Sequence, residues 1–389
     1  MVGTPDVAEH AFKSGFSFRD GRFWRSSLGS HRRRSYPGKP VFVERKTDML
    51  KKLKQTTLAS LKGSGAFNLV HNSRWRRQRL LILAYHGISL DDEHDWNPAQ
   101  YLSKEVFRDR LNLIARSGCT VLPLAEGVRR LYDGDLPERS IVLTFDDGTY
   151  DFYLRAYPLL KEFDYPATLY LTTFYSQYNR PVFDVACSYL LWKGRERTLD
   201  LKSLVGQEIS LDLNSEQART TAFEQIKQFS SEQKLSAPEK DELLAMIAGK
   251  LCVDYESLVS RRVLQLINPG EVKSLAADGI DVQLHTHRHR TPSDRELFLK
   301  EIADNRTSII EMTGKSASHF CYPSGVWSRD FLPWLSEAGI ESATTCEIGL
   351  ATPQSHPLLL PRLVDVSGLS PIEFEGWVTG ISTALPRRR

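Results

Sequence analysis

The chain has 389 residues, of which 41% are hydrophobic and 25% are charged, and its formal net charge is +3. These values allow one large α/β domain or two smaller ones, and they exclude a disordered or fibrous protein. The five cysteines form no CxxC pair, which argues against a zinc knuckle and against a disulfide framework. There is no signal-peptide core and no run of about 18 apolar residues. The expected location is therefore the cytoplasm or the inner face of its membrane.

The charge is distributed unevenly along the chain. Residues 1–79 contain 18 Lys and Arg against 5 Asp and Glu, whereas the remainder contains 33 against 43. Residues 1–48 are rich in Gly, Ser, Arg and Pro, show no sustained period, and are expected to form a disordered leader. A patterned segment begins at Met49, which could be the true start. The basic N-terminal segment, residues 1–79, predicts contact with anionic lipid or, as a less favoured hypothesis, with nucleic acid. The alternative is a solvated tail without a partner.

Residues 49–79 predict a basic amphipathic helix followed by a linker. Leucines at positions 50, 53, 58 and 61 alternate with lysines, and the pattern breaks near Gly63-Ser-Gly65. Such a helix can occupy one of two positions. It can lie on a membrane surface as a peripheral contact, or it can dock on the flank of the following domain, which is the more common outcome.

From residue 80 onward, apolar strands alternate with helical segments. We expect strands at 80–87, 120–122, 141–145, 167–173, 280–284, 318–322, 342–345 and 358–366, and helices at 107–117, 124–132, 151–163, 269–277 and 293–313. A polar, helix-rich section at about 186–266 is expected to be an insertion. The alternation predicts a parallel sheet, and the strand count favours a barrel of about seven strands over an open sheet. In such folds the functional site gathers at the carboxyl ends of the strands.

The strand at 141–145 ends directly in two carboxylates, Asp146 and Asp147, followed by Gly148. Burying adjacent carboxylates is costly unless something pairs with them. A functional site explains this arrangement better than packing does, although a loop with two solvated acids is the simpler alternative. Gly148 permits the sharp turn that lets the two acids face different ways.

Two histidines, His285 and His289, leave the strand at 280–284 four residues apart. Two imidazoles at that spacing can converge on one ion, and Asp147 could supply a third ligand. Three protein ligands are typical of a catalytic metal site, which leaves Asp146 free to act as general base. Zinc is the first expectation, with cobalt, nickel or manganese open. The alternative is a surface loop that happens to contain histidines.

Together these stretches resemble a known family. Thr144-Phe-Asp-Asp-Gly148 and His285-Thr-x-x-His289 are similar to the first two motifs of the polysaccharide deacetylases with NodB homology, carbohydrate esterase family 4, over roughly residues 80–370. The resemblance implies a distorted (β/α)7 barrel domain across 80–389 with a helical insertion. It also implies Asp146 as the base, and Asp147, His285 and His289 as ligands of one divalent ion.

The third motif departs from the family pattern. Cys321-Tyr-Pro-Ser-Gly325 has a cysteine where many members have an arginine that supports the base. Tyr322, Pro323 and the backbone N–H of Ser324 are expected to line the acetate pocket and to stabilise the oxyanion. Arg362 is the candidate to replace the missing arginine near Asp146.

The general acid needs a different source, since the family's late Leu-x-His is not evident and His356 is a poor match. His86, in Ala84-Tyr-His-Gly87, resembles the opening motif of the circularly permuted branch that includes poly-N-acetylglucosamine deacetylases of bacterial biofilm systems. That resemblance implies His86 as the general acid. The alternative is that His86 is a half-buried histidine with a structural role only. Asp184 could border the site. Aromatic residues that could stack on sugar rings are Tyr85, Trp96, Tyr150, Tyr322 and Trp327.

The resulting hypothesis is a metal-dependent hydrolase that removes N-acetyl groups from a polysaccharide or glycolipid. Removal of O-acetyl groups or hydrolysis of a small amide on the same barrel are alternatives. A non-catalytic carbohydrate-binding barrel is a third, because the usual arginine is missing. The sequence leaves the glycan, the native metal and the oligomeric state open.

Overall fold

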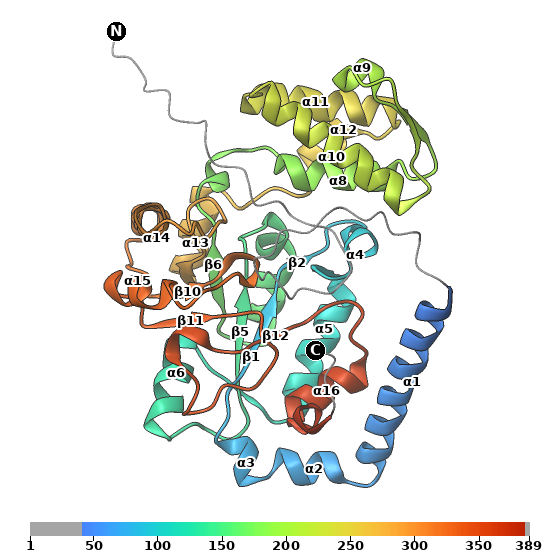
Figure 1. The fold of residues 1–389 in the computed structure, drawn as a ribbon. Helices are drawn as coiled ribbons and strands as arrows, with labels where there is room; N and C mark the ends of the chain where they lie inside the picture. Colours follow the sequence, from blue (N-terminus) through green and yellow to red (C-terminus); the bar gives the residue numbers. More distant parts are fainter. Residues whose placement is uncertain (1–40, 386–389) are drawn as a thin grey trace.

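The computed structural model describes residues 41–385, with side chains from Met49 onward (Figure 1). Of the expected leader, residues 1–40 lie outside this range, and residues 41–48 form the first turns of helix α1 (Val41–Gly63). Across the described range, none of the helices combines the length and the apolarity that are needed to cross a bilayer.

Seven parallel strands form the centre of the molecule. The first six lie side by side in chain order, and the seventh pairs with the first. Their residues are buried on nearly every position, as expected for strands covered on both faces. The strands are β1 (Leu81–Tyr85), β5 (Ser140–Phe145), β6 (Thr168–Leu171), β9 (Asp281–Leu284), β10 (His319–Cys321), β11 (Ser342–Thr344) and β12 (Leu363–Val364). A short strand, β4 (Thr120–Val121), pairs with the start of β5.

The segment between β11 and β12 joins the two ends of this sheet. Leu360 N donates to the carbonyl of Ala343, which lies within β11, and Leu360 O accepts from the N–H of Thr345, which follows β11. Both hydrogen bonds are 2.9 Å long. Three residues later, Leu363 pairs with Leu83 of β1. The sheet therefore curls round on itself, which confirms the predicted distorted seven-stranded barrel. Because all seven strands are parallel, their carboxyl ends lie at one end of the barrel.

Helices surround the barrel. Most of them contribute apolar side chains to one large core, whereas those of residues 124–133 lie in a smaller cluster with Leu80 and Ile82. The expected helix at 269–277 is present with those bounds, and the others differ by a few residues. The helices are α5 (Lys104–Arg116), α6 (Leu124–Asp133), α7 (Tyr157–Glu162), α13 (Pro269–Ala277), α14 (Arg295–Thr313), α15 (Phe331–Glu337) and α16 (Pro371–Thr379). Short elements after β1 are β2 (Gly87–Ile88), α4 (Glu93–Trp96) and β3 (Tyr101–Leu102).

Proline explains two places where the structure differs from the sequence prediction. The expected strand at 358–366 is reduced to β12, and Pro357–Leu359 form a 3-10 turn, η4. Pro357 and Pro361 have no N–H to donate to a sheet. The expected helix at 151–163 is divided into a π-helical turn, η1 (Phe152–Ala156), and α7. Pro158 near the start of α7 cannot continue the α-helical hydrogen-bond ladder.

The N-terminal helices α1, α2 (Ala66–His71) and α3 (Arg74–Arg77) pack on α16. Leu58 and Phe67 are buried in this contact, and Lys54 and Lys62 form ion pairs with Glu373 and Glu375 of α16. The basic helix is thus docked on the flank of the domain. Its outer face still exposes Met49 and Leu53 beside Lys51 and Lys52, so peripheral membrane contact stays a prediction.

Residues 183–264 form a helical lobe with its own hydrophobic cluster, drawn above the barrel in Figure 1. The lobe leaves the barrel after β6. It returns alongside the loop that follows Asp147, where Ile267 N donates to Gly148 O and Tyr150 N donates to Gln265 O. Its elements are α8 (Phe183–Lys193), β7 (Thr198–Asp200), α9 (Lys202–Val205), β8 (Ser210–Asp212), α10 (Glu216–Glu232), α11 (Ala237–Lys250) and α12 (Tyr255–Ser260).

Candidate active site

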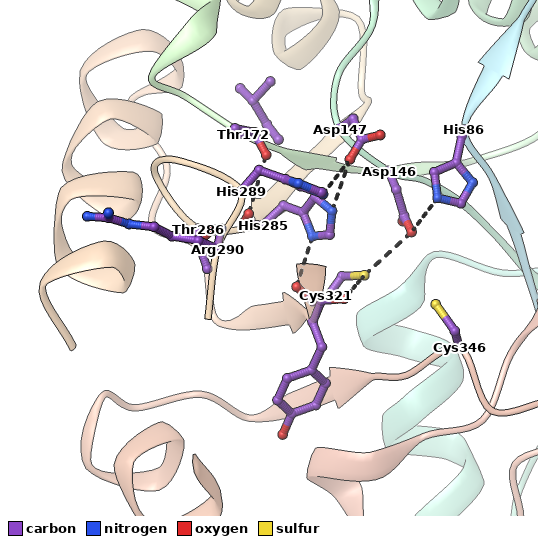
Figure 2. A network of polar contacts seen from close by, with 12 residues as sticks. His86, Asp146, Asp147, Thr172, His285, Thr286, His289, Arg290, Cys321 and Cys346 are labelled. Atoms are coloured by element: carbon purple, nitrogen blue, oxygen red, sulfur yellow. Dashed lines mark hydrogen bonds and ion pairs between the residues drawn. The ribbon is translucent and has the colours of Figure 1, made fainter. Parts of the chain in front are cut away.

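Polar residues from several strands meet at the carboxyl end of the barrel (Figure 2). His86 follows β1, Asp146 and Asp147 follow β5, and His285 follows β9. In Figure 2 the imidazoles of His285 and His289 converge on Asp147, whereas His86 and Cys321 lie on either side of Asp146. The parallel topology brings these residues together, although almost 200 positions separate His86 from His285 in the chain.

Asp147, His285 and His289 form a compact set of potential metal ligands. Asp147 Oδ1 lies 3.2 Å from His285 Nε2 and 3.1 Å from His289 Nε2. Bonds of about 2.0–2.1 Å in a tetrahedral arrangement place ligand atoms about 3.3 Å apart, so the set fits a zinc-sized ion. The Nδ1–H of His285 donates to the Cys321 carbonyl at 2.9 Å, which directs the lone pair of Nε2 toward Asp147. The residues present therefore fit a divalent cation.

A second group, Asp146, His285 and Cys321, also has ligand atoms within 4.8 Å of one another. It is less suited to a cation, because the Arg362 guanidinium donates to both Asp146 Oδ2 and Cys321 Sγ. A metal ion there would face a full positive charge at hydrogen-bond distance. The ligand set around Asp147 is the better candidate.

Arg362 makes a bidentate contact with Asp146. Its Nη1 and Nη2 atoms lie 2.8 Å from the two carboxylate oxygens, and both side chains are buried. Nη1 also donates to Thr144 Oγ1, and Nε donates to the Thr345 carbonyl. Arg362 stands just before β12, and its side chain meets residues of β5, β10 and the end of β11, so it runs inside the barrel.

The neighbouring charges set the pKa values of the site. Burial raises the pKa of Asp146, but Arg362 outweighs this effect and holds the pKa below the usual range. Burial likewise raises the pKa of Asp147, whereas His289 and His285 lower it well below that range. Burial lowers the pKa of His285, but Cys321 and Asp147 raise it more. Both carboxylates are therefore ionised at neutral pH, and a cation bound at Asp147 would displace a proton from His285.

His86 lies on the other side of Asp146 from the metal-ligand set, with its Nε2 atom 3.8 Å from Asp146 Oδ2. The side chain is 18% exposed, so the ring borders the site and is not enclosed in the core. Its Nδ1 atom is buried and has no hydrogen-bond partner within residues 41–385. A ring with this access can exchange a proton with a molecule in the site.

Each of the three motifs contains at least one non-glycine residue with a positive φ. Asp147, Thr286, His289 and Ser324 have φ values of 71°, 61°, 54° and 55°, in the left-handed region that L-residues seldom adopt. Such strain persists only where the surroundings impose it, and it clusters at functional sites. Gly148 also has a positive φ of 83°, and a Cβ there would lie 2.4 Å from the Leu171 side chain. The sharp turn after the two acids thus requires glycine.

The third motif is only partly available to a ligand. The Tyr322 ring is fully buried in the main core, and its hydroxyl donates to the Leu358 carbonyl. The prediction that the Tyr322 side chain contacts substrate is therefore wrong. Successive side chains along a strand point to opposite faces, and this one points into the core. Pro323 is buried and Ser324 is exposed in the turn after β10. Their role in an acetate pocket stays a prediction.

Other sequence candidates are placed away from the reacting groups. Tyr85 is buried in the core against Phe145, which excludes stacking on a sugar. Asp184 forms an ion pair with Lys227 inside the helical lobe. The exposed His356 accepts a hydrogen bond from Leu358 N at the start of η4. The remaining aromatic candidates are half-buried: Trp96 packs on Tyr189, Tyr150 lies under Arg262, and Trp327 packs against the main core.

Three polar residues near the ligands were not identified from the sequence. Glu301 and Asn305 lie on the buried face of α14, and Thr172 follows β6; all three make hydrogen bonds to the histidine motif or to Asp147. The sequence contained a pattern that could have revealed Glu301 and Asn305, because these two polar residues, four apart, interrupt the apolar face of α14. Asp151 was also missed. It is buried, and burial raises its pKa to about 8.

Comparisons with known proteins identify the family to which this chain is related. The family model for polysaccharide deacetylase matches residues 133–343. Among curated proteins, the poly-β-1,6-N-acetyl-D-glucosamine N-deacetylase of Escherichia coli is 28% identical over 102 residues, which is 26% of this chain and 15% of that protein. The protein of the same name from Staphylococcus epidermidis is 24% identical over 226 residues, which is 53% of this chain and 72% of that protein.

Two solved structures share the fold. Streptococcus pyogenes deacetylase PplD, in complex with acetate, has a TM-score of 0.50 and 18% identity, covering 76% of this chain and 96% of that one. IcaB from Ammonifex degensii has a TM-score of 0.50 and 16% identity, covering 77% and 97%. The family model covers more than half of the chain, which confirms the resemblance seen in the motifs. The protein belongs to the polysaccharide deacetylase family.

Proposed function

We propose that this protein is a metal-dependent hydrolase that removes N-acetyl groups from a polysaccharide, with polymers of N-acetylglucosamine as the first candidate. The observation that carries the proposal is the position of Asp146. Its carboxylate is held by Arg362, faces His86, and is next in the chain to a three-ligand metal set. The substrate class follows the names of the related proteins from Escherichia coli and Staphylococcus epidermidis.

Asp147, His285 and His289 would hold the ion, and zinc suits a carboxylate and two imidazoles best, with cobalt, nickel and manganese as alternatives. A divalent cation in such a site lowers the pKa of a bound water and polarises a carbonyl oxygen. Asp146 is the general base in this proposal. It is ionised at neutral pH, and the bidentate contact with Arg362 fixes its orientation, so it can accept a proton from the attacking water.

His86 is the general acid. An amine is a poor leaving group unless it is protonated, so hydrolysis of an amide needs a proton donor on the leaving-group side. His86 is partly exposed on the side of Asp146 away from the metal-ligand set, and it can serve there. The backbone N–H of Ser324, in the turn after β10, is the proposed donor to the developing oxyanion.

The decisive experiment is the Asp146→Asn variant assayed for acetate release from oligomers of β-1,6-linked N-acetylglucosamine. The amide keeps the size of the side chain but cannot accept the proton, so we expect one ion per chain to remain bound while turnover falls by at least 100-fold. Retained turnover would refute the role of Asp146. The same assay on chitooligosaccharides, acetylated xylan and small amides separates the alternative substrates. No acetate release from any of them would favour a non-catalytic barrel.

A further inference from the structure

Helix α14 carries two buried polar residues beside the histidine motif. Its inward face is otherwise apolar, with Phe298, Ile302 and Ile309 in the main core. Glu301 and Asn305 lie one turn apart on this face and are 1% and 0% exposed. Polar groups at such positions are costly unless every one of them is hydrogen-bonded. Their partners therefore indicate what the two residues hold in place.

Asn305 connects the ends of two strands. Its Oδ1 atom accepts a hydrogen bond of 2.9 Å from the backbone N–H of His285. Its Nδ2 atom donates to the Leu171 carbonyl at the end of β6 and to Thr173 Oγ1. One amide thus fixes the first histidine ligand relative to the neighbouring strand.

Glu301 holds the rest of the histidine loop. Its backbone carbonyl accepts from His287 N, and its Oε2 atom accepts from Arg288 N at 2.8 Å. Its Oε1 atom accepts from Arg290 Nε at 2.6 Å and from Arg288 Nη1 at 3.1 Å. The buried carboxylate is therefore neutralised by two arginines of the loop that it positions, and these lie on either side of His289.

Thr172, directly after β6, extends these contacts to the third ligand. Its backbone N–H donates to the Asp147 carbonyl at 3.2 Å, and its hydroxyl donates to the His285 carbonyl at 3.3 Å. In Figure 2, Thr172 lies above the histidine segment, to the left of Asp147. Protein contacts thus hold the backbone on both sides of the metal-ligand set: Thr172 holds Asp147, and Glu301 of α14 holds the residue before His289. Asp147 and His289 both have positive φ values, which persist only where the surroundings impose them.

We propose that Asn305 and Glu301 are positioning residues for the metal centre: they form an α14 clamp that holds the ligands in their binding geometry and thereby sets the affinity for the cation. This inference rests on the metal assignment in the proposed function. Residues that orient the ligands of a metal typically change its affinity by about 10–100-fold when they are removed.

The test measures zinc affinity of the metal-free, full-length protein by competition with a chromophoric chelator, together with its melting temperature. We expect Asn305→Ala and Glu301→Gln each to weaken zinc binding by about 10–100-fold. Asn305→Asp provides a variant of unchanged size that loses both Nδ2 donors. Excess zinc should restore acetate release in these variants, which it cannot do for Asp146→Asn. Two exposed changes on the same helix, Thr307→Ala and Glu311→Gln, should leave zinc affinity unchanged.

The outcomes separate the clamp from the proposed function. A lower melting temperature with unchanged zinc affinity would reduce Asn305 and Glu301 to structural residues and overturn the clamp alone. A wild-type protein that binds zinc but releases no acetate would overturn the proposed function, while the affinity comparison still decides the clamp. A wild-type protein that binds no divalent ion would overturn both.

Discussion

Arg362 and Asp146 form a buried, bidentate ion pair, although 216 positions separate them in the chain. Cys321 occupies the place where the family's third motif commonly has an arginine, and its Sγ atom lies 3.1 Å from Arg362 Nη2. A guanidinium from the segment before β12 thus reaches the carboxylate that the missing arginine would support. The site keeps a positive charge beside the proposed base, but this charge comes from the segment before β12 and not from the third motif.

Replacing Arg362 with Gln should raise the pKa of Asp146, because burial is then opposed only by the smaller effects of His86 and His285. The acid limb of the pH profile of kcat/KM should move to higher pH. Breaking a buried pair from one side should also lower the free energy of unfolding by about 3–5 kcal/mol. Activity profiles between pH 4 and pH 9 and denaturant unfolding check both effects. An acid limb at the wild-type position would show that Arg362 does not control Asp146.

Replacing Cys321 with Ala should have a much smaller effect. Asp146 keeps both hydrogen bonds from Arg362, and the Asp147 ligand set does not include the thiol. We expect turnover within a few-fold of wild type and one bound ion per chain, measured by acetate release and metal analysis. Loss of the ion from Cys321→Ala would instead assign the metal to the group formed by Asp146, His285 and Cys321.

His86→Gln should reduce deacetylation of an N-acetylated oligosaccharide by about 10²–10⁴-fold, the usual contribution of a general acid. An activated ester such as 4-nitrophenyl acetate has a leaving group that needs no proton, so its hydrolysis should fall far less. The ratio of the two rates is the measurement. An equal loss on both substrates would indicate that His86 acts through the structure of the site and not as a proton donor.

Asp151 should make stability depend on pH. It accepts hydrogen bonds from Ile88 N and Thr149 Oγ1, and burial raises its pKa to about 8. The folded protein therefore keeps a proton that the unfolded chain releases near pH 4, so stability falls as pH rises from about 4 to about 8. Between pH 6 and pH 8 this loss is on the order of 2 kcal/mol.

The variant Asp151→Asn isolates this contribution, since the amide keeps an oxygen acceptor and does not titrate. The unfolding free energy of the variant should fall less between pH 6 and pH 8 than that of the wild type, and the difference should be on the order of 2 kcal/mol. Parallel pH dependences in the two proteins would assign the titration to another group. Denaturant unfolding at several pH values provides the comparison.

The outer face of α1 predicts binding to anionic membranes. Residues 49–79 contain eight Lys and Arg and no Asp or Glu, and Met49 and Leu53 are more than 60% exposed. Full-length protein should sediment with phosphatidylglycerol vesicles at low salt and not with phosphatidylcholine vesicles, since each basic residue near such a surface contributes about 1 kcal/mol. The double change Lys51→Glu and Lys52→Glu should abolish binding, whereas the exposed Lys250→Glu in the lobe should not. Binding that survives the double change would exclude α1 as the contact.

The amino-acid sequence by itself determined the barrel and the core of the site. Apolar strands alternating with helices require right-handed crossovers, and these place all strand ends, with Asp146, Asp147 and His285, at one end of the barrel. A glycine after two acids and histidines four apart are local patterns, so they are visible without a fold.

Only the tertiary structure decided which distant side chains meet at that end. A side chain on a strand points inward or outward according to register, and a shift of one residue reverses it. Register placed Arg362 inside the barrel against Asp146 and put the Tyr322 ring in the core. The contacts of Asn305 and Glu301 with the histidine loop depend on how α14 packs against β9, and the sequence around α14 predicts only that one face is buried.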